Sequence, residues 1–298
     1  MIQERKRAGD LRSEFEQQII FPAVRNPLVY RAFCNVDRAL FTPADQINLA
    51  YTNEIIDIGE GSSISEPFLV AMMTDNLELT GEEKVLEVGT GSGYQAAILS
   101  HCSSEIHTID INSRLAFEAY QRLSSLNYSN IHVHLGDGTL GIPNESPFDA
   151  IIVTAGAKKI PIALKEQLAV GGRIVVPTGN DLKQLNLIVG LKQTGGSIRT
   201  DVIALVRFHP LLSKHHGGWD PDVFEEARQK RIERRMELLT QLAAKLGTTL
   251  PELRSETARK FNIEPDNNWH NVDDFLVFNT INLILAFMEK GDVQNSQP

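Results

Sequence analysis

The chain is short of cysteine, of long apolar runs and of positive charge. Its two cysteines, Cys34 and Cys102, are far apart and show no metal-ligand spacing, so we expect reduced thiols in a cytoplasmic protein. No apolar stretch is long enough to span a bilayer, and residues 1–7 lack the following apolar run of a secretory signal. The net charge of −9 argues against a nucleic-acid-binding surface, which normally carries a basic patch. Neither a membrane nor a nucleic acid is therefore expected as a partner.

What the chain does contain is a regular alternation of apolar runs and helical patterns from residue 84 onward. This alternation predicts a parallel sheet with crossover helices, a doubly wound α/β fold, preceded by helices over residues 1–45. Gly195 and Gly196 separate two further apolar runs, which predicts a hairpin that closes the sheet. The expected strands are 84–88, 105–110, 131–135, 149–153, 172–176, 185–191 and 201–207, and the expected crossover helices are 93–101, 113–126 and 160–168.

The remaining segments are less regular. Residues 59–67 are rich in glycine and serine and are expected to form a loop, with Pro67 starting a helix. We expect an α/β domain over 1–212 and a helical C-terminal extension over 213–298, where the composition becomes charge-rich. A last helix over 272–290 is apolar on more than one face and must be buried. Packing on the α/β domain, a partner-binding appendage or a homodimer through these helices would each bury it.

Residues 85–94 carry the strongest motif, Val-Leu-Glu-Val-Gly-Thr-Gly-Ser-Gly-Tyr. Glycines at alternate positions after a strand let the backbone turn sharply and approach a ligand closely. Dinucleotide-binding proteins usually show G-x-G-x-x-G, whereas E-x-G-x-G-x-G is typical of S-adenosylmethionine (SAM) dependent methyltransferases; a glycine-rich turn for another ligand is the alternative. Backbone N–H groups of such a loop suit the SAM carboxylate, and the acidic residue suits its ammonium or orients the loop. The residues expected to hold the cofactor here are Glu87, Gly89, Thr90, Gly91, Ser92 and Gly93.

The next two strands end in aspartates that extend this site. Asp110 is placed to accept hydrogen bonds from both ribose hydroxyls, although it could instead cap the following helix, as Asn112 or Ser113 could. Asp137, followed by Gly138, is placed to accept from the adenine amino group, with a plain turn as the alternative. Together with the glycine loop, these strand ends predict a Rossmann-like SAM-methyltransferase sheet.

His209, His215 and His216 form a histidine cluster in the sequence, with Trp219 nearby. No cysteine or carboxylate stands at ligand spacing from them, so we interpret them as solvated loop residues. The sequence analysis therefore predicts no metal site.

The chain resembles the protein-L-isoaspartate O-methyltransferase family over about residues 30–212. General methyltransferases share only the glycine loop, whereas the tyrosine and glutamine after it are particular to this family. The strand end at Thr154 and Ala155, where a transferred methyl group would lie, is particular to it as well. The matching segments are residues 85–97, 136–138, 147–155, 171–173, 176–177, 31–33, 36–41 and 206–211.

This resemblance implies methylation of an isoaspartyl carboxyl group in a peptide or damaged protein, followed by collapse of the ester to a succinimide. A carboxylate is already a nucleophile at neutral pH, so the enzyme needs alignment and exclusion of water rather than a base or a metal. Ser65 occupies the position of the serine in the family's Thr-Ile-Ser-x-Pro loop, which positions the acceptor. Ser62, Ser63 and Ile64 are the neighbouring substrate-binding candidates, although Ser62 and Ser63 could equally cap the helix after Pro67.

The sequence departs from the family around this serine. The usual Gly-Gln-Thr-Ile-Ser-Gln-Pro becomes Gly-Ser-Ser-Ile-Ser-Glu-Pro at 61–67, and Asp57, Glu60 and Glu66 make the segment acidic. Carboxylates repel an acceptor carboxylate unless they point away or meet a basic peptide. Relatives with C-terminal extensions methylate an aspartate of a ribosomally made peptide, which then forms an aspartimide; this is the competing acceptor. A non-catalytic SAM-fold binding module is the alternative of another class, and the retained glycine loop and Ser65 argue against it.

Overall fold

A computed structural model describes residues 10–221, 237, 240–241, 244 and 249 of the chain. The chain divides into two compact units, residues 1–111 with 115–220 and residues 112–114 with 221–298. The first unit thus includes 213–220, which the sequence analysis assigned to the extension. Most of the expected C-terminal helices, including 272–290 and the homodimer contact through them, lie outside the described residues.

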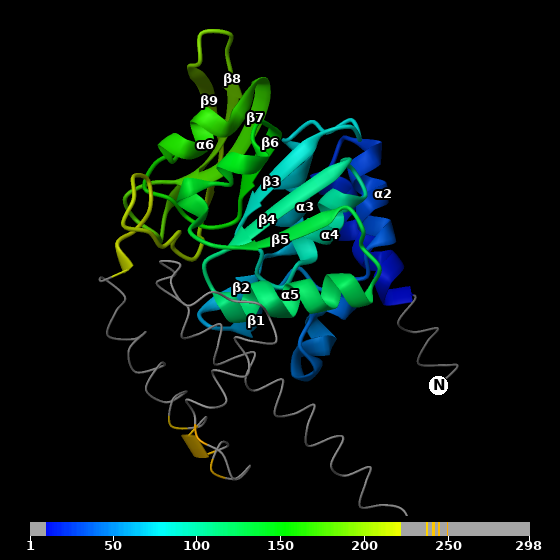
Figure 1. Cartoon of the computed structure of the whole chain (residues 1–298). Helices are drawn as coiled ribbons and strands as arrows, with labels where there is room; N and C mark the ends of the chain where they lie inside the picture. The colour runs from blue at the N-terminus through cyan, green and yellow to red at the C-terminus, as the bar shows by residue number, and fades with distance from the viewer. Residues whose placement is uncertain (1–9, 222–236, 238–239, 242–243, 245–248, 250–298) are drawn as a thin grey trace, which may run out of the picture. The chain divides into compact units, whose positions relative to one another are not determined.

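Within the described residues, seven strands form one sheet in the order β5-β4-β3-β6-β7-β8-β9, drawn in Figure 1. The first five strands in this order are parallel, and β8 and β9 form an antiparallel hairpin at the edge. The chain builds outward from β3 through β4 to β5 and then returns to the other side of β3 with β6. Ligands of open α/β sheets bind beyond the carboxyl ends of the strands at such a reversal. The strands are β3 (Lys84–Val88), β4 (Glu105–Asp110), β5 (Ile131–Leu135), β6 (Phe148–Val153), β7 (Leu168–Thr178), β8 (Leu185–Lys192) and β9 (Ile198–Val206).

The helices also follow the sequence pattern. Asn26 begins α2 by accepting a hydrogen bond from the Leu28 N–H at 2.9 Å, and Pro27 occupies the first helical turn. In the described part of the chain, no helix has the length and apolar character needed to cross a membrane. Residues 10–15 are α-helical. The other α-helices over residues 16–221 are α2 (Pro27–Asn35), α3 (Pro67–Asp75), α4 (Tyr94–Ser100), α5 (Ser113–Ser125) and α6 (Ile162–Gln167), and the shorter helical turns there are η1 (Glu16–Ile20), η2 (Phe21–Ala23), η3 (Arg38–Phe41), η4 (Ala44–Leu49), η5 (Gly138–Leu140) and η6 (Pro143–Glu145).

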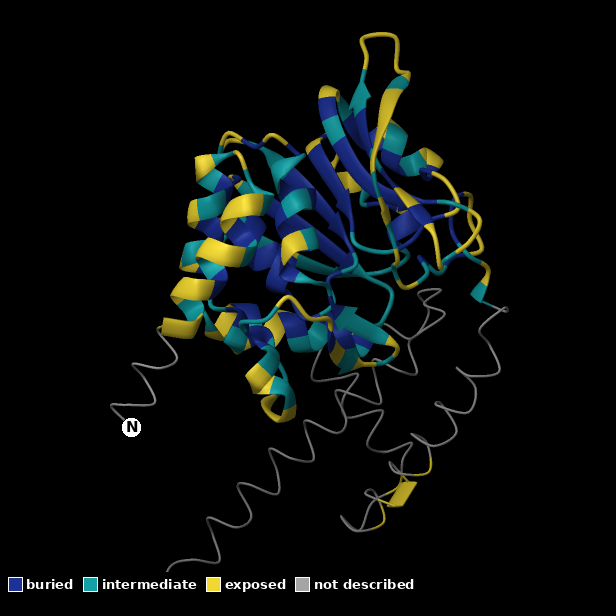
Figure 2. Ribbon diagram, turned by 180° about the vertical axis from the view of Figure 1, so that it is seen from behind, coloured by how far each residue is buried: buried dark blue, intermediate teal, exposed yellow. Residues whose placement is uncertain are grey.

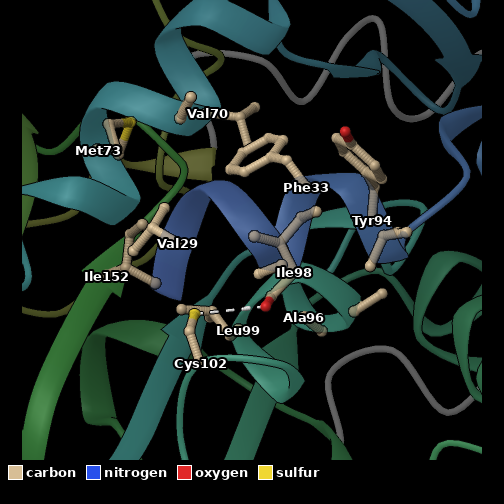
Figure 3. Close-up of a cluster of buried hydrophobic side chains, with 14 of the residues drawn as sticks. Val29, Phe33, Val70, Met73, Tyr94, Ala96, Ile98, Leu99, Cys102 and Ile152 are labelled. Atoms are coloured by element: carbon tan, nitrogen blue, oxygen red, sulfur yellow. Dashed lines mark hydrogen bonds between the residues drawn. The ribbon is translucent and has the colours of Figure 1, made fainter. Parts of the chain in front are cut away.

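Two clusters of buried apolar side chains pack against the sheet, one on each face, as a doubly wound fold requires. Figure 2 shows that the residues of the central strands are mostly buried. On one face, α2, α3 and α4 pack against the strands; Figure 3 shows Phe33, Met73 and Ile98 among the side chains of this buried cluster. On the other face, Leu164 of α6 packs with Phe148 and Ile174. The predicted doubly wound fold is confirmed, and so is the hairpin that closes the sheet.

The segment expected as a glycine- and serine-rich loop is instead a second, two-stranded sheet. Strands β1 (Ile56–Gly59) and β2 (Ser62–Ile64) pair antiparallel, and Ile56 and Ile64 are buried partners across them. The turn between the strands has positive φ at all three residues, 80° at Gly59, 57° at Glu60 and 68° at Gly61. The loop prediction was wrong because burying the two isoleucines outweighs the low strand propensity of the glycines.

Candidate cofactor and acceptor site

The glycine loop lies where the carboxyl ends of β3 and β6 meet. Thr154, directly after β6, donates its hydroxyl hydrogen to the carbonyls of Val88 at 3.0 Å or Gly89 at 2.7 Å. Its N–H also donates to the Val88 carbonyl at 2.9 Å. Thr154, predicted to mark the methyl-transfer edge, therefore ties the two central strands together beside the glycine loop.

Two glycines allow backbone segments to approach more closely than any side chain would permit. Gly89 has φ of 105°, and a Cβ placed on it would lie 2.3 Å from Thr154 Oγ1. A Cβ on Gly138 would lie 2.3 Å from Val88 Cγ1. The two glycines thus make room for the side chains of Thr154, directly after β6, and of Val88, at the end of β3.

Gly89→Ala is expected to weaken SAM binding by more than about tenfold, because the loop must move away from Thr154 to make room. The left-handed backbone adds a cost of about 1–2 kcal/mol. Gly196→Ala is the matched control, since Gly196 has φ of 80° in the β8–β9 turn with no atom within 4 Å of its Cβ position. Calorimetric titration of both variants with SAM measures the difference. Equal affinities would show that the contact with Thr154 does not shape the site.

Glu87 is fully buried at the end of β3, and neither carboxylate oxygen has a hydrogen-bond partner among the described residues. Burial raises the pKa of Glu87 from 4.5 to about 8. The nearby Thr108 hydroxyl lowers this pKa and Asp110 raises it further. A buried carboxylate without a partner is costly, and a cationic group such as the SAM ammonium would supply one. This orphaned pair of oxygens fits the cofactor that the motif predicts.

Asp110 binds the glycine loop rather than capping α5. Its Oδ2 accepts the Gly91 N–H at 2.9 Å, whereas Asn112 accepts the Arg114 N–H at 3.0 Å in the capping position. The capping alternative for Asp110 is therefore wrong. The carboxylate sits at the strand end where the sequence analysis expected a ribose partner, and that role stays a prediction.

The amide groups of the glycine loop are largely used inside the protein. Besides the Gly91 amide, that of Gly89 donates to the Ile109 carbonyl at 2.8 Å and that of Gly93 to the Thr90 carbonyl at 2.9 Å. The buried Thr90 hydroxyl pairs with that of Thr108 at 2.7 Å. The glycines therefore contribute shape more than hydrogen-bond donors, and the expected contact with the SAM carboxylate falls to the amides of Thr90 and Ser92.

Asp137 is held by two hydroxyl residues that the sequence analysis missed. Its Oδ1 accepts the N–H and the hydroxyl of Thr139 at 2.9 and 2.7 Å, and its Oδ2 accepts the Ser213 hydroxyl at 2.6 Å. The turn that was the alternative reading is thus present, while an adenine contact stays a prediction. Thr139 follows the common Asx-turn spacing, whereas nothing in the sequence connects Ser213 with a residue 76 positions earlier.

The acceptor segment leads from β2 into α3. Ile64 is buried, while Ser62, Ser63 and Ser65 are half-buried. The suggestion that Ser62 or Ser63 caps the following helix is wrong, because the Asn53 side chain accepts the Phe68 N–H at 3.0 Å. Ser62, Ser63 and Ser65 therefore stay available as substrate-binding candidates.

A buried guanidinium holds this segment in place. Arg38 is 1% exposed, and burial lowers its pKa to about 10. Its side chain also lies over the Tyr94 ring, 5.9 Å from the centroid. The carbonyls that accept its N–H groups are those of Leu49, Ala50, Thr52, Glu54 and Ser65, at 2.9–3.3 Å. Arg38 thus fixes the backbone of Ser65, a role for which the family match at 36–41 was the only sequence signal.

Comparisons with known proteins agree with this arrangement. The family model described as protein-L-isoaspartate(D-aspartate) O-methyltransferase matches residues 14–216. The chain is 44% identical over 204 residues to a protein-L-isoaspartate O-methyltransferase of Geobacter metallireducens, covering 68% of this chain and 93% of the relative. It is 40% identical over 203 residues to that of Roseiflexus sp., covering 68% and 91%.

Solved structures show the same fold. One protein-L-isoaspartate O-methyltransferase superposes with a TM-score of 0.62 at 25% identity, covering 73% of this chain and 69% of that chain. Another, from Plasmodium falciparum in complex with S-adenosyl-L-homocysteine, gives a TM-score of 0.58 at 22% identity, covering 67% and 97%. The chain therefore belongs to the protein-L-isoaspartate O-methyltransferase family of SAM-dependent protein carboxyl methyltransferases.

Proposed function

We propose that this chain methylates the carboxyl group of isoaspartyl residues in damaged proteins, and that Ser65 positions that carboxyl group. The observation that carries the proposal is that the family match spans both halves of the site. It includes the glycine loop at 89–93 and the acceptor segment at 62–65. A binding module without activity would need only the fold, so retention of both halves favours catalysis.

The cofactor half of the proposal assigns each strand end a group of SAM. When bound, SAM supplies a methyl group activated by a positively charged sulfur. Glu87 holds the ammonium group, Asp110 the ribose hydroxyls and Asp137 the adenine amino group. Gly138 allows the adenine to approach closely. The buried, unpartnered oxygens of Glu87 are the main support for the first of these assignments.

The acceptor half needs positioning rather than acid–base chemistry. An isoaspartyl carboxylate is ionised at neutral pH, so no proton has to be removed from the nucleophile. The Ser65 hydroxyl donates a hydrogen bond to one carboxylate oxygen and leaves the other to attack the methyl carbon in line with the sulfur. Ser62, Ser63 and Ile64 contact the neighbouring peptide, while Thr154 and Ala155 border the transferred methyl group.

The acidity of the acceptor segment supports a second candidate acceptor, the aspartate of a precursor peptide. Asp57 is exposed, and its Oδ1 accepts the Gly59 N–H at 2.8 Å within the β1–β2 hairpin. A basic peptide would be attracted to this surface, as a dedicated peptide substrate requires. The helical extension after residue 212 would grip such a peptide.

A matched pair of peptides tests the acceptor. We expect the isoaspartyl peptide to gain one methyl group by mass spectrometry and its aspartyl twin to remain unchanged. Methylation of the aspartyl peptide alone would contradict the repair activity and favour the tailoring role.

Ser65→Ala is expected to lower kcat/KM for the isoaspartyl peptide by about 100-fold, because misplacing a reacting group costs about that factor. The affinity for SAM should stay within about twofold. Ser197→Ala, on the exposed β8–β9 turn, is the matched control and should behave as wild type. An unchanged rate in Ser65→Ala would remove Ser65 from the mechanism.

Three further assignments are proposals of the same kind. Free thiols at Cys34 and Cys102 support a cytoplasmic location. Residues 213–298 form the appended region in this proposal, although 213–220 belong to the compact α/β unit. A homodimer through the C-terminal helices would bury their apolar faces, and light scattering of the full chain measures it.

A further inference from the structure

Three histidines and two glutamates gather near the amino ends of β4 and β5. His107 and His132 are paired residues in neighbouring parallel strands, and His134 lies two positions further along β5. The rings of His107 and His132 stack with centroids 4.9 Å apart. Glu105 begins β4, and Glu145 ends η6 beside it. His132 and His134 lie two residues apart, but His107 is 25 residues away, and only the pairing of β4 with β5 brings it to them; the sequence analysis considered only the histidines at 209–216.

The atoms of this cluster have the spacing of metal ligands. Glu105 Oε1 lies 2.9 Å from His107 Nε2 and 3.7 Å from His132 Nε2, and the three atoms are all within 4.8 Å of one another. A tetrahedral cation with bonds of about 2.0–2.2 Å has its ligand atoms about 3.3–3.6 Å apart. Small movements of the side chains would bring the observed distances into the range expected for a tetrahedral site. Glu145 Oε2, 3.7 Å from His107 Nε2, is within reach of the fourth position.

A second histidine orients the first. His107 Nδ1 lies 3.0 Å from His134 Nε2, so the His107 ring can donate from Nδ1 and present the Nε2 lone pair to a cation. Metal-bound histidines almost always make such a contact with their other nitrogen. His132 is half-exposed and gives the site a path to solvent.

The ammonium group of Lys84 lies beside the two glutamates of this cluster and would compete with a bound cation. Its Nζ lies 3.2 Å from Glu145 Oε2 and 3.9 Å from Glu105 Oε2. The other oxygen of Glu105 faces the imidazoles, so that carboxylate can bridge the lysine and a cation. The ammonium group lowers the affinity for a cation without blocking the three ligand atoms.

We propose that Glu105 Oε1, His107 Nε2 and His132 Nε2 bind a divalent cation of the zinc class, with His134 orienting His107. Two imidazoles and one carboxylate are a ligand set that zinc takes, with a remaining position for water or Glu145. The site lies toward the amino end of β4: Glu105 and His107 are five and three residues before Asp110, which contacts the glycine loop, so they lie roughly 16 and 10 Å from it along the strand. A bound cation would therefore link β5, the edge strand of the sheet, to β4, and would take no part in methyl transfer.

Titration of the tag-free, full-length protein tests the site. We expect one equivalent of Zn²⁺ to bind by calorimetry, and Co²⁺ to give the visible absorption bands of a tetrahedral complex. His132→Ala should weaken binding by more than about 100-fold, and His134→Ala by about 10–100-fold. Failure of the wild-type protein to bind Zn²⁺, or equal affinities in wild type and His132→Ala, would overturn the proposal.

Two further variants separate coordination from general effects of histidine or charge. His209→Ala removes an exposed histidine outside the cluster and should leave the affinity unchanged. Lys84→Met removes the competing ammonium and should tighten binding several-fold; weaker binding in this variant would contradict the geometry. Methylation of the isoaspartyl peptide should be unaffected by His132→Ala, so the outcome is independent of the proposed function.

Discussion

Arg38→Met is expected to lower methylation of an isoaspartyl peptide by about 100-fold and to leave the affinity for SAM within about tenfold of wild type. The guanidinium donates to five carbonyls of the segment that ends at Ser65. Methionine fills a similar volume but supplies no donor, so several carbonyls in and around a buried region lose their partners. Each buried carbonyl left unpaired costs about 1–3 kcal/mol, and the segment is expected to relax toward water instead. Ser65 then loses its fixed position, whereas the glycine loop keeps its own hydrogen bonds.

Peptide methylation and SAM binding must be measured on the same preparations to separate the two halves of the site. Arg38→Lys keeps the charge, but a single ammonium with three hydrogens cannot reach carbonyls spread over 49–65, so intermediate activity is expected. Arg199→Met, on the exposed face of β9, is the matched control for replacing arginine by methionine. If Arg38→Met methylates the peptide at a rate within tenfold of wild type, the acceptor segment does not depend on Arg38.

Much of the fold could be predicted because it depends on local pattern. The bounds of β3, β4 and β5 agree with the predicted ranges, and each strand ends at or directly before a glycine or aspartate. Strand β7, predicted as 172–176, runs over Leu168–Thr178 with a register irregularity opposite β6. The longer strand includes Gly171 and Gly172, where the pairing is interrupted: β6 pairs with Leu168 before them and with Arg173 after them, and β8 pairs only from Arg173 onward.

In the candidate site, the positions of the residues could be predicted from the sequence, but their hydrogen-bond partners could not. The positions of Gly89, Asp110 and Asp137 could be predicted because parallel strands bring their carboxyl ends to one edge. The partners of these residues could not, because a hydrogen bond between Ser213 and Asp137 depends on how a distant loop folds back. The neighbours of Glu105 could not be predicted for the same reason, since only the pairing register of β4 and β5 brings His132 close to it. Spacing in the sequence identifies functional groups on one element better than groups gathered from several.

Glu87 gives the largest expected effect on stability. Its folded pKa of about 8 lies above the value of 4.5 for a free glutamate, so the native state favours the protonated form. The contribution of Glu87 to the free energy of unfolding is fully present below pH 4.5. It falls between pH 4.5 and 8, because the carboxyl group ionises in the unfolded chain, and it is lost above about pH 8. The total loss is roughly 5 kcal/mol at most.

Glu87→Gln keeps the shape of the protonated side chain and removes its titration. Urea unfolding at pH 5, 6, 7 and 8 should show the variant gaining stability relative to wild type as the pH rises. The exposed Glu14→Gln serves as the matched control for replacing a glutamate by glutamine at the surface. A stability difference for Glu87→Gln that does not change with pH would show that Glu87 is ionised in the folded protein.

The same carboxyl group couples the cofactor to protons. If Glu87 holds the SAM ammonium, binding at pH 7 must ionise a carboxyl group that is mostly protonated in the free enzyme, so up to one proton is released. Calorimetric titrations in buffers of different ionisation enthalpy measure this number, and Glu87→Gln should release about one proton fewer than wild type. Equal proton release by the two proteins would place the ammonium elsewhere and leave Glu87 as a group that only orients the glycine loop.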